Sequence, residues 1–181
     1  TAFATAAVRE ASDGEEFCRE VYEATEQKIW IIDGREEARL SAQGILLGWP
    51  GSYGLVCDLG GSSLELAEIN NGEVGRRTTS RLGPLKLMEI EGGRAARAKF
   101  IRATIKELAL EMGPQHNRLF LVGGSWRALA RIDMARTNYP LLVLHEYRMD
   151  VASVHKTLDY IKKNSAAELQ NESRLSEARF S

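Results

Sequence analysis

Residues 54–71, GLVCDLGGSSLELAEINN, place the tightest constraint on what this chain can fold into. The opening apolar run predicts a short buried strand, and the alternating pattern from Leu64 predicts a second. Asp58 and Gly60–Ser63 lie between these strands, and Asn70–Gly72 supplies a turn into a third. The stretch therefore predicts a strand, a glycine turn, a second strand and a hairpin.

The residue types in the glycine turn suit a bound phosphate. Gly60 and Gly61 allow positive φ angles and bring backbone N–H groups close to an anion. Ser62 and Ser63 add hydroxyl donors, and Asp58 can hold a divalent cation that neutralises the anion. The alternative is a tight hairpin turn that needs glycine only for its backbone conformation.

Asp33-Gly34-Arg35-Glu36 is a capping signature, which predicts a helix that begins after Asp33 and runs to about Gly48. Asp33 is the expected N-cap, and the Glu36 side chain is expected to reach back to it. Glu37 lies in the first turn and has no such structural explanation. Without further information, it is a surface glutamate that complements the helix dipole. The buried side of this helix is expected to consist of Ala38, Ala42, Ile45 and Trp49.

Gly123 and Gly124 follow a predicted buried strand, 118–122, and lead directly into a helix that starts at Ser125. A strand, a glycine pair and a helix N-terminus together can form an anion site from backbone N–H groups. The alternative is an ordinary turn between strand and helix in which Ser125 serves as the cap.

Basic residues are concentrated between Arg76 and Lys106, where only Glu89 and Glu91 oppose nine arginines and lysines. Such a stretch is either a solvated helix face or a local positive field that steers a polyanion. Within it, residues 94–112 predict the longest helix, and its buried side is expected to consist of Ile101, Ile105, Leu108 and Met112. Near the other end of the chain, residues 165–172 are polar and are expected to be mobile.

The sequence from Asp58 to Leu66, DLGGSSLEL, resembles the second phosphate motif of the exopolyphosphatase / guanosine-pentaphosphate phosphatase family. That family belongs to the actin/Hsp70/sugar-kinase-like superfamily, in which a D-x-G-G-G-S-T-E-L type loop holds phosphate. This chain departs from the motif twice, because Ser62 replaces the third glycine and Leu64 replaces the threonine. Three further stretches match in order, and with the loop they cover most of the chain: Ala4–Ala11, Ile32–Leu40 and Val122–Ser125.

The resemblance assigns a role to each candidate site residue. Glu37 corresponds to the proposed catalytic base, and Glu65 is a second carboxylate that helps to position water or metal. Asp58 is the metal-side carboxylate, with Mg²⁺ or another divalent cation implied by its hard oxygen ligands. The residues expected to bind substrate phosphate are Arg9, Gly60, Gly61, Ser62, Ser63, Gly123, Gly124 and Ser125.

The order of predicted elements alternates strands and helices around a β-meander, which favours an α/β fold. The resemblance specifies a ribonuclease-H-like (actin-like ATPase) half-domain with a mixed sheet and flanking helices. We expect residues 1–181 to form one phosphate-binding half-domain, with 1–11 as the tail of a preceding half-domain that carries the family's D-x-G-S motif. The chain is thus expected to be a fragment of a longer protein.

Composition places the chain among cytoplasmic globular proteins. Of its 181 residues, 44% are hydrophobic and 27% are charged. Cys18 and Cys57 are far apart and indicate no disulfide framework, so a reducing cytoplasm is the expected location. No apolar run is long enough to cross a bilayer.

The expected function is phosphoanhydride hydrolysis that resembles exopolyphosphatase activity, with inorganic polyphosphate or guanosine pentaphosphate as substrate. We expect neither nucleic acid nor a membrane as a partner, and a homodimer in the full-length protein. Two alternatives are an ATP-dependent kinase of the same superfamily and a non-catalytic module that binds polyphosphate or alarmone. The Glu-Glu-Ala-Arg stretch at Glu36–Arg39 argues against the kinase, whereas the two departures from the loop motif leave the regulator open.

Overall fold

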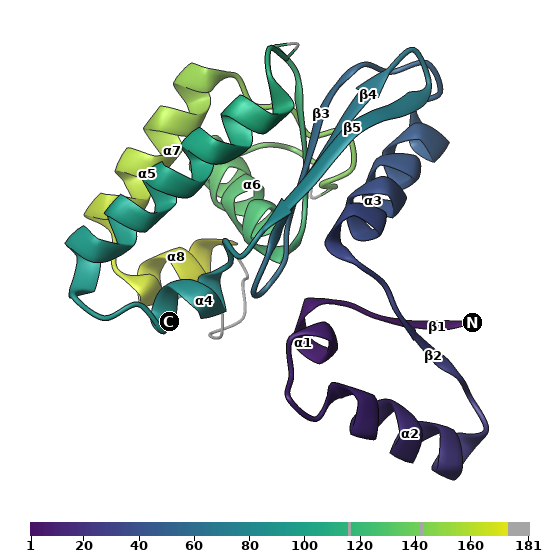
Figure 1. The fold of residues 1–181 in the computed structure, drawn as a ribbon. Coiled ribbons are helices and arrows are strands. Elements are labelled where there is room, and N and C mark those ends of the chain that lie inside the picture. Colours follow the sequence, from purple (N-terminus) through teal and green to yellow (C-terminus); the bar gives the residue numbers. More distant parts are fainter. Residues whose placement is uncertain (116, 142, 174–181) are drawn as a thin grey trace. The chain divides into compact units, whose positions relative to one another are not determined.

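The computed structural model describes residues 1–115, 117–141 and 143–173, in which strands and helices alternate as a mixed α/β protein (Figure 1). The expected fold class is confirmed. The chain divides into two units, Thr1–Val122 and Gly123–Ser181. The expectation that it forms one half-domain, with 1–11 as the tail of another, stays a prediction.

The first unit begins with a small parallel sheet. Strands β1 (Ala2–Ala4) and β2 (Ile29–Ile31) pair along their whole length, with Ala4 opposite Ile31. Between them lie two helices, α1 (Ala6–Arg9) and α2 (Gly14–Thr25). The short α1 was not expected from the sequence, and it places Arg9 in its last turn.

The larger sheet of the first unit contains the predicted meander. Its strand order is β5-β4-β3-β6, in which the three meander strands are antiparallel and β6 runs parallel to β3. The glycine turn therefore joins two neighbouring strands, as the sequence predicted. The strand bounds are β3 (Gly54–Leu59), β4 (Leu64–Asn70), β5 (Glu73–Ser80) and β6 (Leu119–Val122).

Helix α3 (Gly34–Gly48) packs on one face of this sheet (Figure 1). Ala38 and Ala42 are buried against Val56, Ala67, Ile69 and Phe120 from three strands, and Ile45 and Trp49 pack at the margin of this core. The predicted buried side of the helix is confirmed. Because both alanines are small, the helix axis approaches the sheet closely at this point.

The other face of the sheet is contacted by α5 (Gly93–Met112), which packs against β5. Neighbouring residues of a strand point to opposite faces. On β5, the hydroxyl of Thr78 donates to Glu111 of α5, whereas the next residue faces α3. The predicted buried side of α5 is wrong at Ile105, which is 46% exposed, and Thr104 is buried in its place. Thr104 thus places a hydroxyl on the side of α5 that was expected to be apolar. A short helix before α5, α4 (Pro84–Met88), was not expected from the sequence.

The second unit consists of three helices within the described residues: α6 (Gly124–Arg136), α7 (Val151–Lys163) and α8 (Ala166–Ser173). Ile132 of α6 and Leu169 of α8 are buried together, with Tyr160 of α7 packed against them. Leu169 anchors α8 to this small core, so a helix forms where the sequence predicted none; the expected mobility of residues 165–172 stays a prediction.

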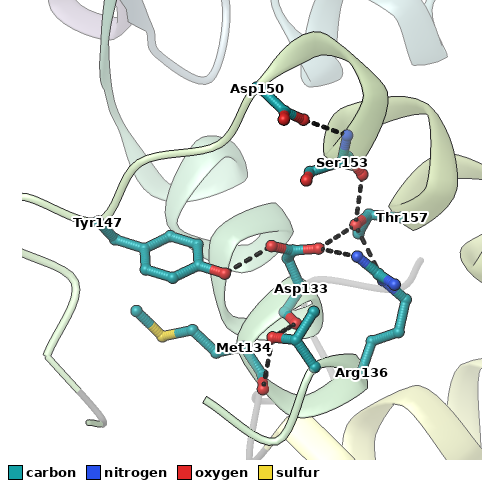
Figure 2. Close-up of polar contacts among 8 residues, drawn as sticks. Asp133, Met134, Arg136, Tyr147, Asp150, Ser153 and Thr157 are labelled. Carbon is teal, nitrogen blue, oxygen red and sulfur yellow. Dashed lines mark hydrogen bonds and ion pairs between the residues drawn. The ribbon is translucent and has the colours of Figure 1, made fainter. Parts of the chain in front are cut away.

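A buried carboxylate links α6 to α7 (Figure 2). Asp133 accepts hydrogen bonds from Thr157 on α7, from Arg136 on its own helix and from Tyr147 in the loop between the helices. Burial opposes ionisation of Asp133, but these hydrogen bonds outweigh it and lower the pKa of the carboxyl. Burial, together with the neighbouring Asp133, raises the pKa of Tyr147 to about 12. The network fixes the geometry of the second unit.

Candidate active site

Three polar residues form a row across the face of the sheet that α3 covers. Asp58 on β3 lies directly opposite Glu65 on β4, and Glu65 lies directly opposite Thr79 on β5. Directly paired residues on neighbouring strands share a face and bring their Cβ atoms within about 5.5 Å. Two carboxylates that are separated by the glycine turn in the sequence are therefore neighbours in the fold.

Helix α3 adds two further side chains above this row. Glu37 and Ser41 are four residues apart, so they lie on the same side of the helix one turn apart. The Ser41 hydroxyl donates to Asp58 Oδ2. The charge of Glu37 helps to raise the pKa of Glu65, so the Glu37 carboxylate lies within electrostatic range of the row. The helix thus delivers Glu37 to the same place as the two carboxylates of the sheet.

The start of α3 explains why Glu37 is available for this role. Asp33 caps the helix as predicted, because its carboxylate accepts from the backbone N–H of Glu36 at 2.8 Å. The expectation that Glu36 reaches back to the cap is wrong. Its carboxylate instead binds Arg39 through two hydrogen bonds, since Arg39 lies one turn further along the same helix. Glu36 is therefore engaged on the helix surface, and Glu37 is the glutamate that faces the sheet.

Arg9 reaches the site from the end of α1. Its Nη1 atom donates to the carbonyl of Ile32 at 2.7 Å and to Glu37 Oε2 at 3.2 Å. The two charged side chains are only 22% and 18% exposed, so water screens their ion pair little. Arg9 therefore holds Glu37 in place, and its binding of substrate phosphate stays a prediction.

Glu65 is the most deeply buried of the carboxylates, with 1% of its surface exposed. The Thr79 hydroxyl donates to Glu65 Oε1 at 2.9 Å, whereas Oε2 has no hydrogen-bond partner among the described residues. Burial raises the pKa of Glu65 to about 7; the nearby hydroxyls of Ser63 and Thr79 oppose this, and the charges of Glu37 and Asp58 reinforce it.

Gly34 permits the close packing of α3 over Thr79. A Cβ atom at Gly34 would lie 2.4 Å from Thr79 Oγ1, so any larger residue would push the helix start away from β5. Thr79 in turn holds Glu65. The glycine of the capping signature therefore has a second task, which is to let the helix carrying Glu37 approach the carboxylate row.

The glycine turn is closed by a hydrogen bond from the N–H of Gly60 to the carbonyl of Ser63 at 3.0 Å. No hydrogen bond from the described residues engages the N–H groups of Gly61 and Ser62, so both are available to an anion. Neither Gly60 nor Gly61 uses the positive φ that glycine allows. Gly61 instead meets a neighbour, because a Cβ there would lie 3.2 Å from the side chain of Leu85.

A second glycine, Gly83, packs against the backbone of the glycine turn. Gly83 directly precedes α4, and a Cβ atom there would lie 2.3 Å from the carbonyl oxygen of Gly61. The same carbonyl accepts from the N–H of Leu85 at 2.9 Å. The start of α4 is therefore packed directly against the backbone of the glycine turn.

Gly123, Gly124 and Ser125 belong to the second unit. Gly123 is the N-cap of α6 with φ +115, a conformation that favours glycine, and Ser125 lies exposed in the first turn. The alternative in which Ser125 caps the helix is wrong, because Gly123 holds that position. Their contribution to an anion site stays a prediction.

The residues around Asp58 fit a magnesium ion better than a metal that needs an all-protein cage. No group of three or more histidine, cysteine, aspartate or glutamate side chains within the described ranges could hold a metal. Mg²⁺ is commonly bound through one or two carboxylates, with water and substrate phosphates completing its octahedron. Asp58 Oδ1 has no hydrogen-bond partner in the described part of the chain and could provide such a ligand.

Sequence reasoning missed Ser41 and Thr79, which hold the two carboxylates of the sheet. Ser41 could have been found from its spacing, because it follows Glu37 by one helical turn. Thr79 could not, since its place opposite Glu65 depends on the register of β5, which shifts at an irregularity between Ala67 and Ile69.

The raised pKa of Glu65 gives a prediction about stability and pH. The unfolded chain titrates this group near 4.5 and the folded protein near 7, so the folded state binds more protons between these values. The contribution of Glu65 to the free energy of unfolding is therefore fully present below pH 4.5, and it is lost as the pH rises through 7. We expect Glu65→Gln to melt progressively higher, relative to the unmodified protein, as the pH rises from about 5 to 8.

Melting curves at several pH values test this expectation, with Glu73→Gln at the exposed start of β5 as the matched control. The control should show a constant difference across the pH range. The same constant difference for Glu65→Gln would mean that Glu65 does not titrate in this range.

Solved structures of other proteins share this fold. An exopolyphosphatase from Cytophaga hutchinsonii superimposes with a TM-score of 0.80 at 18% sequence identity, covering 98% of this chain and 61% of that chain. A Ppx-GppA enzyme of Aquifex aeolicus gives a TM-score of 0.74 at 18% identity, covering 99% of this chain and 62% of that one. This chain thus spans about three-fifths of the length of either structure.

The site residues fall within a region that a sequence-family model also matches. The model is that of the Ppx/GppA phosphatase family, and it matches residues 1–179. That range contains the glycine turn, the carboxylate row and α3. We conclude that the chain belongs to the Ppx/GppA phosphatase family.

Proposed function

We propose that the full-length protein hydrolyses phosphoanhydride bonds, releasing the terminal phosphate of inorganic polyphosphate, with guanosine pentaphosphate as a related substrate. The observation that carries this proposal is the gathering of Glu37, Asp58 and Glu65 near a glycine turn in which two N–H groups have no partner among the described residues. Hydrolysis of a phosphoanhydride requires a positioned water, a base and neutralisation of the phosphate. Membership of the Ppx/GppA phosphatase family supports the same chemistry.

Glu37 is the proposed general base. Its carboxylate is held by Arg9, so its orientation is set before a substrate arrives. It would accept a proton from the attacking water as the oxygen–phosphorus bond forms. A fixed base of this kind contributes typically 10²–10⁴-fold to the rate.

Asp58 is the proposed metal ligand, and Glu65 assists it. A divalent cation at Asp58 would neutralise charge on the terminal phosphate. Glu65 Oε2 is buried without a hydrogen-bond partner in the described ranges, which costs free energy unless something binds there. An attacking water, or a water bound to the cation, would satisfy this atom. We therefore assign Glu65 the positioning of that water.

The phosphate itself would be held by backbone and hydroxyl groups. The N–H groups of Gly61 and Ser62 have no hydrogen-bond partner among the described residues and offer donors for phosphate oxygens. Arg9, which holds Glu37, would add positive charge. Gly60 and Ser63 of the same turn supply the remaining proposed contacts.

The test is a turnover assay of the full-length protein with Mg²⁺ and three substrates: polyphosphate, guanosine pentaphosphate and ATP. We expect phosphate release from polyphosphate, from guanosine pentaphosphate or from both. Binding of polyphosphate without release would favour the non-catalytic module. Phosphate transfer from ATP to an acceptor, without attack on polyphosphate, would favour the kinase.

Eight of the nine basic residues between Arg76 and Lys106 fall into two groups in the structure. Arg76, Arg81 and Lys86 are paired with carboxylates. By contrast, the basic side chains of α5 are exposed and form no ion pair within the described part of the chain; these are Arg94, Arg97, Lys99, Arg102 and Lys106. The second group is the one that could attract a polyanion over a distance.

No helix in the described part of the chain is both long and apolar enough to cross a membrane.

Changing Arg94, Arg97 and Arg102 together to glutamate should lower kcat/KM for long polyphosphate at low salt. The effect should shrink as salt is added, because exposed charges are screened over about 8–10 Å at moderate ionic strength. The measurement is a salt series of kcat/KM, with Arg19→Glu on α2 as the control. An unchanged kcat/KM at low salt would leave the basic residues of α5 as a solvated face.

A further inference from the structure

We propose that Ser41 is a positioning residue that determines how Asp58 presents its carboxylate to a divalent cation. The proposal rests on the proposed function, in which Asp58 binds the metal. It extends that function to a residue outside the glycine turn, and it predicts a metal preference as well as a metal affinity.

The contact between Ser41 and Asp58 joins a helix to a strand. Ser41 lies in the middle of α3, and Asp58 lies near the end of β3, where the strand meets the glycine turn. Ser41 Oγ donates to Asp58 Oδ2. It is the only hydrogen-bond donor to the Asp58 side chain within the described residues. Without Ser41, no side-chain contact of that kind would fix the rotation of this carboxylate.

The helix around Ser41 is itself held firmly. Ala38 is 1% exposed and Ala42 is 0% exposed, and both pack into the core beneath the helix. Ser41 is adjacent to Ala42 and is half-buried, so its hydroxyl reaches the sheet from a fixed backbone position. Its effect on Asp58 is therefore one of orientation, since the packing of α3 depends on the alanines.

The choice of oxygen matters for the chemistry. A hydrogen bond to Oδ2 uses a lone pair of that atom and leaves Oδ1 as the better ligand. A carboxylate held in this way is suited to binding a cation through one oxygen. Mg²⁺ and Mn²⁺ fit such a ligand, whereas Ca²⁺ takes more oxygen ligands in a more flexible shell that also accepts bidentate carboxylates. Ser41 should therefore favour the smaller cations over Ca²⁺ at Asp58.

The test measures cation binding directly in the full-length protein, in the presence of inorganic phosphate. Free Mn²⁺ is followed by electron paramagnetic resonance, and Ca²⁺ is measured by competition. We expect Ser41→Ala to weaken Mn²⁺ binding by about 10–100-fold, the usual cost of losing a residue that orients a metal ligand. Ca²⁺ binding should weaken much less. Ser41→Thr keeps the hydroxyl and should restore most of the Mn²⁺ affinity.

Two controls separate orientation from general damage. Gln43→Ala lies on the exposed side of the same helix and should change neither affinity nor melting temperature appreciably. In turnover, Ser41→Ala should raise the Mg²⁺ concentration needed for half-maximal activity while kcat at saturating Mg²⁺ stays near that of the unmodified protein. A loss of kcat that Mg²⁺ does not restore would contradict a positioning role.

Asp58→Asn distinguishes a failure of this inference from a failure of the proposed function. If the unmodified protein binds Mn²⁺, Asp58→Asn abolishes binding and Ser41→Ala binds as before, Asp58 is the ligand but Ser41 does not position it. If Mn²⁺ binding is unaffected by Asp58→Asn, or absent throughout, the proposed metal role of Asp58 is wrong, and the inference is overturned with it.

Discussion

Glu37→Gln is expected to lower kcat of the full-length protein by about 10²–10⁴-fold, the usual cost of removing a positioned general base. Glutamine keeps the size of the side chain and can still accept a hydrogen bond from Arg9, but it cannot take a proton from water. Binding of polyphosphate and the melting temperature should therefore stay nearly unchanged. Steady-state kinetics and a melting curve on the same preparation measure both effects.

Glu36→Gln is the matched control, because it makes the same chemical change one residue away. The Glu36 carboxylate pairs with Arg39 on the helix surface, so its loss should leave kcat largely intact. The cap of α3 is also preserved, since Asp33 receives the backbone N–H of Glu36 and not its side chain. Near-normal kcat in Glu37→Gln, or greater damage from Glu36→Gln, would show that the base has been misassigned.

The second large effect is expected at a residue that does not touch substrate. Gly83→Ala should lower kcat/KM by about 10²-fold, the cost associated with displacing a reacting group by about 1 Å. The added Cβ would lie 2.3 Å from the Gly61 carbonyl oxygen, and backbone cannot yield as a flexible side chain does. The glycine turn must therefore move. Because Gly83 has an extended backbone that alanine adopts readily, the damage comes from the contact alone.

Gly44→Ala provides the control for Gly83→Ala. Gly44 lies on α3, and a Cβ atom there would meet nothing within 4 Å. Alanine in the middle of a helix is worth about 0.5–1 kcal/mol over glycine, so this variant should melt slightly higher with unchanged kinetics. If Gly83→Ala keeps normal kcat/KM, the glycine turn tolerates displacement, and the proposal that its N–H groups bind substrate phosphate is wrong.

The sequence predicted the parts of the site that depend on local pattern. The strand, glycine turn and strand around Asp58 follow from apolar periodicity, and the start of α3 follows from Asp33. The meeting of Asp58 with Glu65 and Thr79 does not, because strand register is a property of the folded sheet. The unusual pKa of Glu65 was equally beyond prediction, since it arises from burial and from neighbours that only the fold assembles.

Some errors had signals that could have been used. Residues 165–168 form a capping box: the Ser165 N–H donates to Glu168 Oε2 at 2.7 Å, and the Glu168 N–H donates to Ser165 Oγ at 3.3 Å. That motif predicts the helix α8, whereas the polar composition alone predicts no ordered element. The burial of Thr104 instead of Ile105 had no such signal, because one residue of rotation along α5 depends on how the helix packs.

The spacing of Glu37 and Ser41 on α3 restricts how the gene for this protein can change. Each residue of an α-helix advances the side chain by about 100°, so one inserted or deleted residue between them would swing Ser41 away from Asp58 while Glu37 stayed in place. Substitutions between these positions alter one contact at a time. An insertion or deletion instead separates the proposed base, Glu37, from the proposed positioning residue, Ser41, in a single step. We therefore expect homologues that retain the site to show no alignment gap between these positions. A gap there would mark a lineage that has lost this arrangement, even where every side chain of the site is still encoded.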